Sequence, residues 1–443
     1  MNNSLLLYGL LAVYAGLLGA TRGTEAFGLL TVIAVGVAAV TLICLTLPSK
    51  PIRAALIISL ILRMGLALGH TYLHPLPDSS LDAVDFEETG WQVARFFSQR
   101  NAVLPDVSGA ELYSLLIGLL YYLFERTPVL PQMINVLLGV ANVYLLSQIT
   151  LELSGSQRAA VAAAVIAAFF PTSNLYSALI MRENLIVFFT ALSLYTMLLW
   201  LKERRLSLLF SSSINLLGAA ALHGGMIVLG APYALVFVLV VLREKGVSSR
   251  KLWQLLLGIC VFTLSLYIFN TALSNKVPED ASTLLRGDFL ARQAETAARD
   301  RAAYLVGLQP SGPGAIIVQT PVRIGFFWLS PFPWMVSSAK DLLGLLDSLL
   351  YLVLLAFGLR GYKSLLQQKE RAALLLLVFL AFSLTFGWGT SNYGAAIRHR
   401  HKLIAVMVPL AATGAVGWRL AGRLGSKGSG ADAGVTSISG LIH

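Results

Sequence analysis

The chain has 443 residues, of which 56% are hydrophobic and 12% are charged, and its formal net charge is +11. Soluble domains carry about a quarter charged residues and under half apolar ones, so this composition argues against a soluble globular protein. The basic residues are spread over short connections between apolar runs, which argues against nucleic-acid binding. Cys44 and Cys260 both lie in apolar segments, so neither a disulfide framework nor a cysteine metal site is predicted.

Apolar segments recur along the whole chain, and most approach the roughly 20 residues that a hydrocarbon core requires. Expected spans include Leu5–Ala20, Ala159–Tyr176 and Leu252–Asn270. Lysine and arginine collect in alternate short connections, which marks those connections as cytoplasmic. The sequence therefore predicts an all-α, polytopic transmembrane bundle of about twelve spans. This domain is expected over residues 1–420, with outer loops at residues 73–108 and 271–340. Residues 421–443, rich in glycine and serine, are expected to form a disordered cytoplasmic tail.

Three segments are expected at the outer membrane surface. Counts of spans from the two termini agree only if Tyr113–Phe124 does not cross fully, so it is predicted to be a re-entrant or juxtamembrane helix. Apolar residues recur at helical spacing opposite acids between Asp85 and Phe97, a pattern typical of a helix lying in the interface. The tryptophans and prolines between Arg323 and Trp334 predict an irregular turn at headgroup depth.

The acids of the first outer loop are the first candidates for chemistry. Asp82, Asp85 and Glu87 follow directly after a helix leaves the membrane. A carboxylate that accepts the proton of a sugar hydroxyl in the transition state accelerates its attack by roughly 10²- to 10⁴-fold. The alternative is that these acids are solvated, or that they stabilise the first turn of a helix through its dipole.

A second acid, Glu183, opens a helix at the outer surface and directly follows Arg182, which is a further substrate-site candidate. Its carboxylate is a candidate for binding an acceptor or a metal ion. The alternative is that it caps the helix and pairs with Arg182. The sequence alone leaves both interpretations open.

The segment from Asn392 to Lys402 is a short, basic outer loop that runs against the positive-inside tendency. A negative group should therefore compensate it. Guanidinium groups bind phosphate oxygens in pairs, so Arg398 and Arg400 are predicted to bind a departing phosphate, with Arg323 and Lys402 as further candidates. The alternatives are contacts with anionic lipid headgroups or a local inversion of the topology.

Two single residues complete the candidates. Arg63 lies in the middle of an apolar segment, where a charge faces a partner or a cavity, or holds helices together through backbone carbonyls. His223 lies at a helix junction, where it either touches substrate or has a structural role. The chain has six histidines, but they form no spaced pair on one helix, which argues against a zinc site built by the protein. A P-loop or Rossmann fingerprint does not occur in a strand-turn-helix context, which argues against nucleotide-driven transport.

The run from Asp82 to Phe86, an acid-Ala-x-x-aromatic pattern before an interfacial helix, resembles the GT-C class of membrane glycosyltransferases. That class includes the dolichyl-phosphate-mannose protein mannosyltransferases and the bacterial aminoarabinose transferases. The resemblance covers the outer loops and the helical body from about Ile52 to Trp418. It implies that Asp82 acts as base or orients the acceptor, and that Glu183 has a site role. Because Ala83 and Phe86 depart from the commoner acidic-acidic-x-x-Tyr form, Asp85 stays open as the working carboxylate.

The resemblance implies an inverting enzyme that moves a sugar from a polyprenyl-phosphate-linked donor to a glycan, lipid or protein acceptor. The expected location is a bacterial inner membrane, with the active site on the periplasmic face and a role in assembling cell-envelope polysaccharide. A divalent cation, Mg²⁺ or Mn²⁺, is allowed as a cofactor but not required. Two alternatives stay open: a repeat-unit polymerase of O-antigen or exopolysaccharide type, and a transporter or flippase for polyprenyl-linked sugars.

Overall fold

The computed structural model describes residues 25–80, 82–100, 102–243, 253, 301–308, 310 and 312–428. These residues form a bundle of helices, and the described part contains no strand beyond one isolated bridge between Ala303 and Asn392. The predicted all-α, polytopic helical architecture is confirmed.

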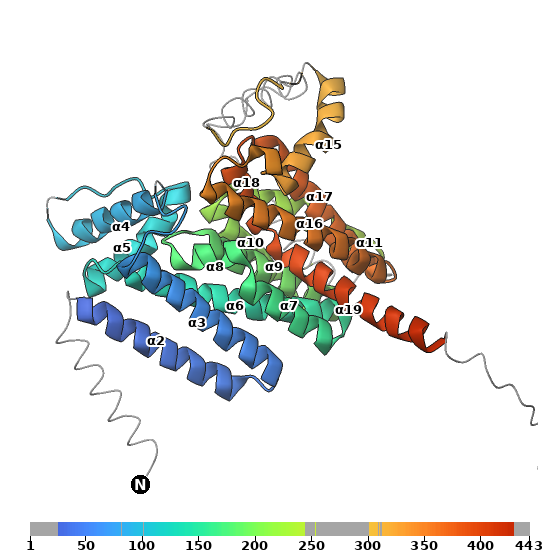
Figure 1. Ribbon diagram of the computed structural model, residues 1–443, viewed down its shortest axis with the longest axis horizontal. Coiled ribbons are helices and arrows are strands. Elements are labelled where there is room, and N and C mark those ends of the chain that lie inside the picture. The colour runs from blue at the N-terminus through green and yellow to red at the C-terminus, as the bar shows by residue number, and fades with distance from the viewer. Residues whose placement is uncertain are drawn as a thin grey trace, which may run out of the picture.

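The helices of the first half pack side by side and occupy the lower and central part of Figure 1. They are α2 (Glu25–Thr46), α3 (Lys50–Tyr72), α4 (Asp82–Ser98), α5 (Leu112–Phe124), α6 (Val129–Ser154), α7 (Gln157–Phe169), α8 (Pro171–Ala178), α9 (Glu183–Glu203), α10 (Leu206–Leu222) and α11 (Gly230–Arg243). The second half contributes α15 (Pro313–Leu329), α16 (Ala339–Leu365), α17 (Lys369–Gly389), α18 (Tyr393–His401) and α19 (Ile404–Gly428).

Within the described ranges, seven helices are long and apolar enough to cross a membrane, or eight if the bent pair α7 and α8 forms one span. Shorter apolar helices are Gly109–Phe124, Leu206–Leu222 and Ile404–Gly417. Two expected spans, Leu5–Ala20 and most of Leu252–Asn270, lie outside the described residues. The count of twelve therefore stays a prediction.

A sharp bend divides the segment that the sequence predicted as one helix from Ala159 to Tyr176. The axes of α7 and α8 differ by 54°. Phe170 adopts an extended conformation between them, with φ −67° and ψ 115°. The cause is Pro171, which lacks an N–H group and disfavours the helical conformation at the residue before it. Pro171 is then the first residue of α8, a position where a backbone N–H group would have no acceptor within the helix.

Arg63 on α3 holds this bend together and is fully buried. Its guanidinium donates to side-chain oxygens and to backbone carbonyls of the bend: Ser59, Ser173, Asn174 and Ser177 through side chains, and Ala167 and Ala168 through the backbone. This is the structural role that the sequence left open for Arg63, because these neutral acceptors satisfy its donors within the helix junction.

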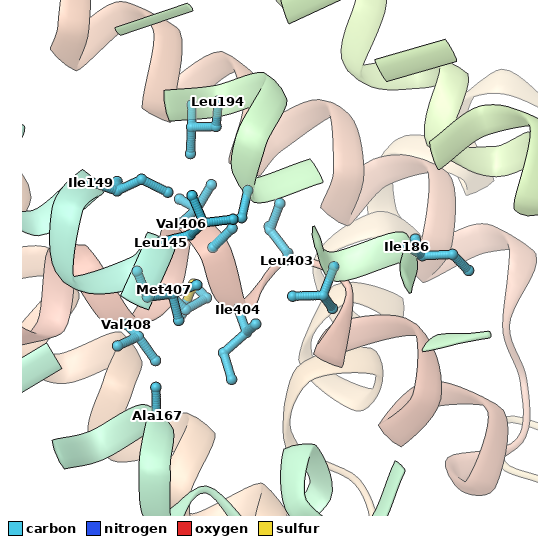
Figure 2. Packing of buried hydrophobic residues seen from close by; sticks show 14 of the residues in the cluster. Leu145, Ile149, Ala167, Ile186, Leu194, Leu403, Ile404, Val406, Met407 and Val408 are labelled. Carbon is cyan, nitrogen blue, oxygen red and sulfur yellow. The ribbon is translucent and has the colours of Figure 1, made fainter. Parts of the chain in front are cut away.

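The first half of α19 is the most deeply buried part of the bundle. Figure 2 shows Leu403, just before α19, and Ile404, Val406, Met407 and Val408 of α19 between residues of α6, α7 and α9. Leu403, Val406 and Val408 are each at most 1% exposed. Because α18 leads directly into this core, the position of α18 is fixed by close packing rather than by a free loop.

One segment differs from expectation. The run beginning at Arg323 was expected to be irregular, but α15 continues as a helix to Leu329 and irregular structure starts only at Ser330.

Residues 301–308 form a short strap, in which Tyr304 N donates to Ser391 O at 2.9 Å and Tyr393 N donates to Ala302 O at 3.0 Å. The strap thus binds the connection that leads into α18.

At the C-terminus, α19 continues to Gly428. The helix therefore enters the segment 421–443 that was expected to be disordered, while residues 429–443 lie outside the described part.

The basic connections predicted to be cytoplasmic meet at one end of the bundle. Lys202 and Arg371 both pair with Glu152, at 3.2 and 2.5 Å, and Arg204 pairs with Glu370 at 2.8 Å. The candidate residues of the outer loops lie at the opposite ends of the same helices.

Candidate functional site

Four connections converge at the end of the bundle opposite the pairs of Glu152 with Lys202 and Arg371: the segment before α4, the turn before α9, the end of α10, and α18. In Figure 1 the start of α4 lies beside α8, and α18 lies above the same region. Asn392 caps α18, since its side-chain oxygen accepts from Gly394 N at 2.8 Å and Ala395 N at 3.3 Å. The cap sets the direction in which the basic side chains of α18 project.

Arg398 lies between two acids that are far apart in sequence. Its Nη1 is 2.7 Å from Asp82 Oδ2, and its Nη2 is 3.0 Å from Glu183 Oε1. The Glu183 side chain is fully buried, whereas that of Asp82 is 44% exposed. Burial opposes the charge of Arg398, but Glu183, Tyr176 and Asp82 outweigh it and raise the pKa of Arg398. The structure thus brings into contact three residues that the sequence analysis selected in three separate segments.

Arg182 borders this ion cluster. Its Nη1 donates to the carbonyl of Leu222 at 2.7 Å, and its guanidinium lies over the ring of Phe86, 5.3 Å from the centroid. Burial lowers the pKa of Arg182, although Glu183 acts in the opposite direction. Its Nε is buried without a hydrogen-bond partner, so one donor remains for a ligand or a water molecule.

Asp78 is an acid of the site that sequence reasoning did not select. It has a left-handed backbone, with φ 66°, a conformation that Asp adopts more readily than most residues other than glycine. The residue is exposed as a whole, but its carboxylate accepts a hydrogen bond from the buried Tyr176 hydroxyl at 3.3 Å. Burial of the carboxyl, with Glu183 and Asp82 nearby, raises the pKa of Asp78 despite the opposing charge of Arg398.

This raised pKa predicts a pH dependence of stability. The folded state binds the proton of Asp78 more tightly than the unfolded chain does, so this group stabilises the fold at low pH and the contribution is lost as pH rises through the folded-state pKa. Asp78→Asn should therefore gain in unfolding temperature relative to the wild type as pH rises from about 4 to about 7. Asn tolerates the left-handed conformation as Asp does.

Thermal unfolding in detergent over this pH series measures the difference. Asp85→Asn is the matched control, because Asp85 is exposed. A difference between Asp78→Asn and the wild type that stays constant with pH would refute the assignment.

Next to Arg398 lies a cluster of nitrogen-bearing side chains, formed by His223, His399 and Lys402. The rings of His223 and His399 stack with centroids 5.1 Å apart, and Phe386 packs 4.9 Å from His399. Lys402 is 1% exposed, and its Nζ lies 2.9 Å from His399 Nδ1. Burial lowers the pKa of both Lys402 and His399 well below their usual values. His223 and Lys402 thus belong to one cluster next to the ion pairs.

His401 is a further residue that the sequence did not single out. It is fully buried, its ring packs 5.7 Å from that of Tyr176, and both ring nitrogens lack hydrogen-bond partners. Burial lowers the pKa of His401 to about 3, so the ring is neutral. Its alternation with Arg398 and Arg400 along α18 is the only sequence signal that marks it.

Arg400 points away from Arg398 into a separate network. Its Nε donates to Asp347 Oδ2 at 2.8 Å, Nη1 donates to the carbonyls of Trp328 and Ser330, and Nη2 donates to Ser348 Oγ at 3.1 Å. The guanidinium is fully buried. These contacts occupy Nε and both terminal nitrogens, so the geometry favours a structural role over the predicted phosphate contact.

Two acids predicted for the site lie beside it. Glu87 pairs with Arg126, with Nη2 to Oε2 at 2.6 Å and Nε to Oε1 at 3.0 Å. This pair joins α4 to the connection after α5. Asp85 is exposed one turn along α4 from Asp82. Between the two carboxylates that the sequence left open, Asp82 is the one in contact with Arg398.

Arg323 lies apart from Arg398, on α15. It is fully buried, its Nη2 donates to Leu308 O, and its guanidinium lies over the ring of Trp388, 4.3 Å from the centroid. Its Nε and Nη1 are buried without partners. No acid pairs with it in the described part of the chain.

The described side chains offer no set of ligands for a divalent cation. No group of three or more His, Cys, Asp or Glu side chains in the described ranges is placed to hold a metal ion. The guanidinium of Arg398 occupies the position between Asp82 and Glu183. A divalent ion shared by these carboxylates would have to displace Arg398, so the arrangement does not fit Mg²⁺ or Mn²⁺.

No protein-family model and no curated protein sequence matches the chain. Among solved structures, it is similar to the archaeal oligosaccharyltransferase AglB from Archaeoglobus fulgidus, in complex with an inhibitory peptide and a dolichol-phosphate. The identity is 15% and the TM-score 0.48, over 87% of this chain and 52% of that one.

The apo form of the Archaeoglobus fulgidus oligosaccharyltransferase gives 16% identity and a TM-score of 0.44, over 87% of this chain and 52% of that one. Its complex with Zn and sulfate gives 14% and 0.42, over 84% and 51%. The chain thus spans about half the length of these structures. It is a multi-pass helical membrane protein, and its likeness to these oligosaccharyltransferase structures is a likeness of fold alone.

Proposed function

We propose that the protein is a glycosyltransferase that moves a sugar from a polyprenyl-phosphate-linked donor to an acceptor on the outer face of the membrane. The observation that carries the proposal is Arg398, held between Asp82 and Glu183 with Asp78 beside them. The distribution of lysine and arginine predicts that this end of the bundle faces outward. A lipid carrier can deliver a phosphate-activated sugar to that face.

Each residue has a role in a direct displacement. The acceptor oxygen bonds to the anomeric carbon while the bond from that carbon to the phosphate oxygen breaks, and the electron pair leaves with the phosphate. Attack opposite the leaving group inverts the configuration. Asp82, the half-exposed acid of the site, orients the acceptor hydroxyl and accepts its proton.

Arg398 stabilises the charge that develops on the departing phosphate. It is held in place by Glu183 and by the packing of α18, so little reorganisation is needed when the charge appears. Arg182 has one N–H group without a partner and supplies a second contact. The acceptor, a glycan, lipid or protein, enters past the exposed side of Asp82. We place this reaction in cell-envelope polysaccharide assembly at the periplasmic face of a bacterial inner membrane.

The position of Arg398 between two carboxylates predicts that turnover does not need a divalent ion. Its guanidinium already supplies positive charge between Asp82 and Glu183. Activity should therefore be unchanged after dialysis against EDTA, and added Mg²⁺, Mn²⁺ or Zn²⁺ should not raise it. Loss of activity in EDTA that Mg²⁺ or Mn²⁺ restores would contradict this prediction.

The purified full-length protein, reconstituted in vesicles with a panel of polyprenyl-linked sugars and acceptors, tests the proposed function. The expected result is a new glycosidic bond with inverted configuration. Movement of labelled lipid without a new bond would instead indicate a transporter or flippase. Polymerisation of repeat units that survives Asp82→Asn but not loss of Arg398 would indicate a polymerase without a committed base.

A further inference from the structure

The connection that leaves α3 carries Asp78 in a tight turn of residues 76–79. Ser79 N donates to the carbonyl of Leu76 at 3.3 Å, and Asp78 has φ 66° at the third position of the turn. Pro77 is at the second position. A proline there, followed by a residue with positive φ, is typical of a type II turn. The turn presents the Asp78 carboxylate to the Tyr176 hydroxyl of α8, which donates to it at 3.3 Å.

One backbone hydrogen bond ties this turn to α3. Proline has no N–H group, so Leu76 N–H is the only backbone donor over the run Pro75-Leu76-Pro77. This group donates to Nδ1 of His70, in the last turn of α3, at 3.1 Å. The His70 ring therefore holds the first residue of the turn that presents Asp78.

The end of α3 that carries this ring is itself fixed. The N–H groups of Leu73 and His74 both donate to the carbonyl of Gly69, at 3.0 and 2.9 Å, and so close the helix. Thr71 Oγ1 donates to Gln132 Oε1 of α6 at 2.7 Å. The ring thus gives the turn a rigid attachment point on the bundle.

The hydrogen bond depends on the protonation state of the ring. A ring nitrogen accepts a hydrogen bond only when it carries no proton, so the bond from Leu76 N–H requires a neutral His70 ring with its proton on Nε2. Protonation makes Nδ1 a donor that faces another donor. His74 differs, because its Nδ1 lies 2.8 Å from the carbonyl of Pro75, which can only accept, so that bond survives protonation.

No charged partner holds the His70 ring in one state. Leu76 N–H is its only hydrogen-bond partner among the described residues, and the ring is partly buried. The first turns of α6, which packs against α3, carry no charge. The other titratable or charged residues at this end of the fold lie on α3 and its connection, on α8, at the start of α2 and before α6: Tyr72, His74, Asp78, Tyr176, Glu25, Glu125 and Arg126. Among the described side chains, no ion pair or hydrogen bond links any of them to His70.

We propose that His70 is a positioning residue whose neutral ring holds the turn that presents Asp78 to the site. Protonation of the ring breaks the bond to Leu76 N–H, the turn loosens, and sugar transfer slows. Histidine changes its charge between about pH 5 and pH 8, so acidification of the outer face should lower the rate. The effect on the rate rests on the proposed function, whereas the attachment of the turn does not.

A spin label on the connection tests the attachment without requiring turnover. The label is placed on Ser80→Cys, an exposed position two residues after Asp78, in the full-length protein with Cys44 and Cys260 replaced by alanine. The readout is the mobility of the label between about pH 8 and pH 5. We expect an ordered label at the upper end of this range and a mobile label at the lower end.

Two substitutions of His70 separate the hydrogen bond from the shape of the ring. His70→Asn places an amide oxygen near the position of Nδ1 and accepts at every pH, so the label should stay ordered throughout. His70→Phe keeps a ring without an acceptor, so the label should be mobile throughout. Transfer by His70→Phe at about pH 8 should fall roughly 2- to 10-fold, which corresponds to one net hydrogen bond.

Two controls show which group responds to pH. His74→Asn removes a histidine of the same connection and should keep the pH profile of the wild type. Asp78→Asn should still loosen at low pH, because the group that titrates is His70. Since Asn tolerates positive φ as Asp does, this change leaves the turn intact.

The outcomes separate this proposal from the proposed function. Equal loosening at low pH in the wild type and His70→Asn, or an ordered label in His70→Phe, overturns the attachment, and packing of Leu76 against the core would then hold the turn alone. If His70→Phe does not fold, the comparison of the wild type with His70→Asn still decides. If the label behaves as expected but no sugar is transferred at any pH, the proposed function fails and the attachment of the turn stands. Transfer that falls equally at low pH in the wild type and His70→Asn overturns the effect of His70 on the rate.

Discussion

Arg398→Ala should lower turnover by about 10²- to 10³-fold, because removal of one preorganised donor to a developing charge typically costs this much. The same change should also destabilise the protein. It leaves Glu183, whose side chain is fully buried, without its ion-pair partner, and breaking a buried pair costs about 3–5 kcal/mol. Activity of purified protein and thermal unfolding measure the two effects separately.

A double variant distinguishes catalysis from folding. Arg398→Met with Glu183→Gln removes both charges and should recover most of the lost stability, but not the activity. Arg398→Lys should recover activity only in part, because a lysine cannot make two parallel contacts. If the double variant is as active as the wild type, Arg398 has no part in the transfer step.

Arg400→Ala should lower the stability of the folded protein rather than the rate of the transfer step. Its partner Asp347 is 1% exposed, and truncation of Arg400 would leave this carboxylate buried and unpaired at a cost of about 3–5 kcal/mol. Thr172 also donates a hydrogen bond to Asp347, so α8 should loosen together with α16. The expected result is a large fall in unfolding temperature and in the yield of folded protein.

Arg400→Met combined with Asp347→Leu is the matched control. An apolar pair of similar volume often replaces a buried ion pair at little cost, so this variant should fold and retain measurable transfer. A well-folded Arg400→Ala protein that no longer turns over would restore Arg400 as a phosphate ligand.

The sequence predicted most helices because apolar length, charge and proline act locally. Tyr113–Phe124 was expected not to cross the membrane fully; α5 is one of the shorter apolar helices, and its place relative to the membrane stays a prediction. The bend at Pro171 was missed because the apolar run continues through it. Whether a proline bends a span or begins a new helix depends on what satisfies the freed carbonyls, here Arg63, which is supplied by a distant segment.

The site was predicted in part. Charge distribution placed Asp82, Glu183, His223 and Arg398 on one side, and the structure brings them to one end. The charge distribution could not distinguish Arg398 from Arg400. Residues two apart on a helix project in different directions, and only packing decides which of the two contacts the acids. Asp78 was passed over because its conformation and its contact with Tyr176 depend on a partner that follows 98 positions later.

The hydrogen bonds of Arg63 have a consequence for how the chain enters the membrane. Its partners on α7 and α8 lie 104 to 114 residues further along, so α3 must be inserted by the translocon before any of them has been synthesised. An arginine at the centre of a nascent helix costs about 2.5–3.5 kcal/mol on insertion scales. Until α7 and α8 are inserted, Ser59 of α3 itself is the one acceptor of this network that has been synthesised, so the leucines and isoleucines of α3 must offset most of that cost. Polar substitutions in α3 should therefore impair membrane integration itself, even at lipid-facing positions that touch nothing in the folded protein.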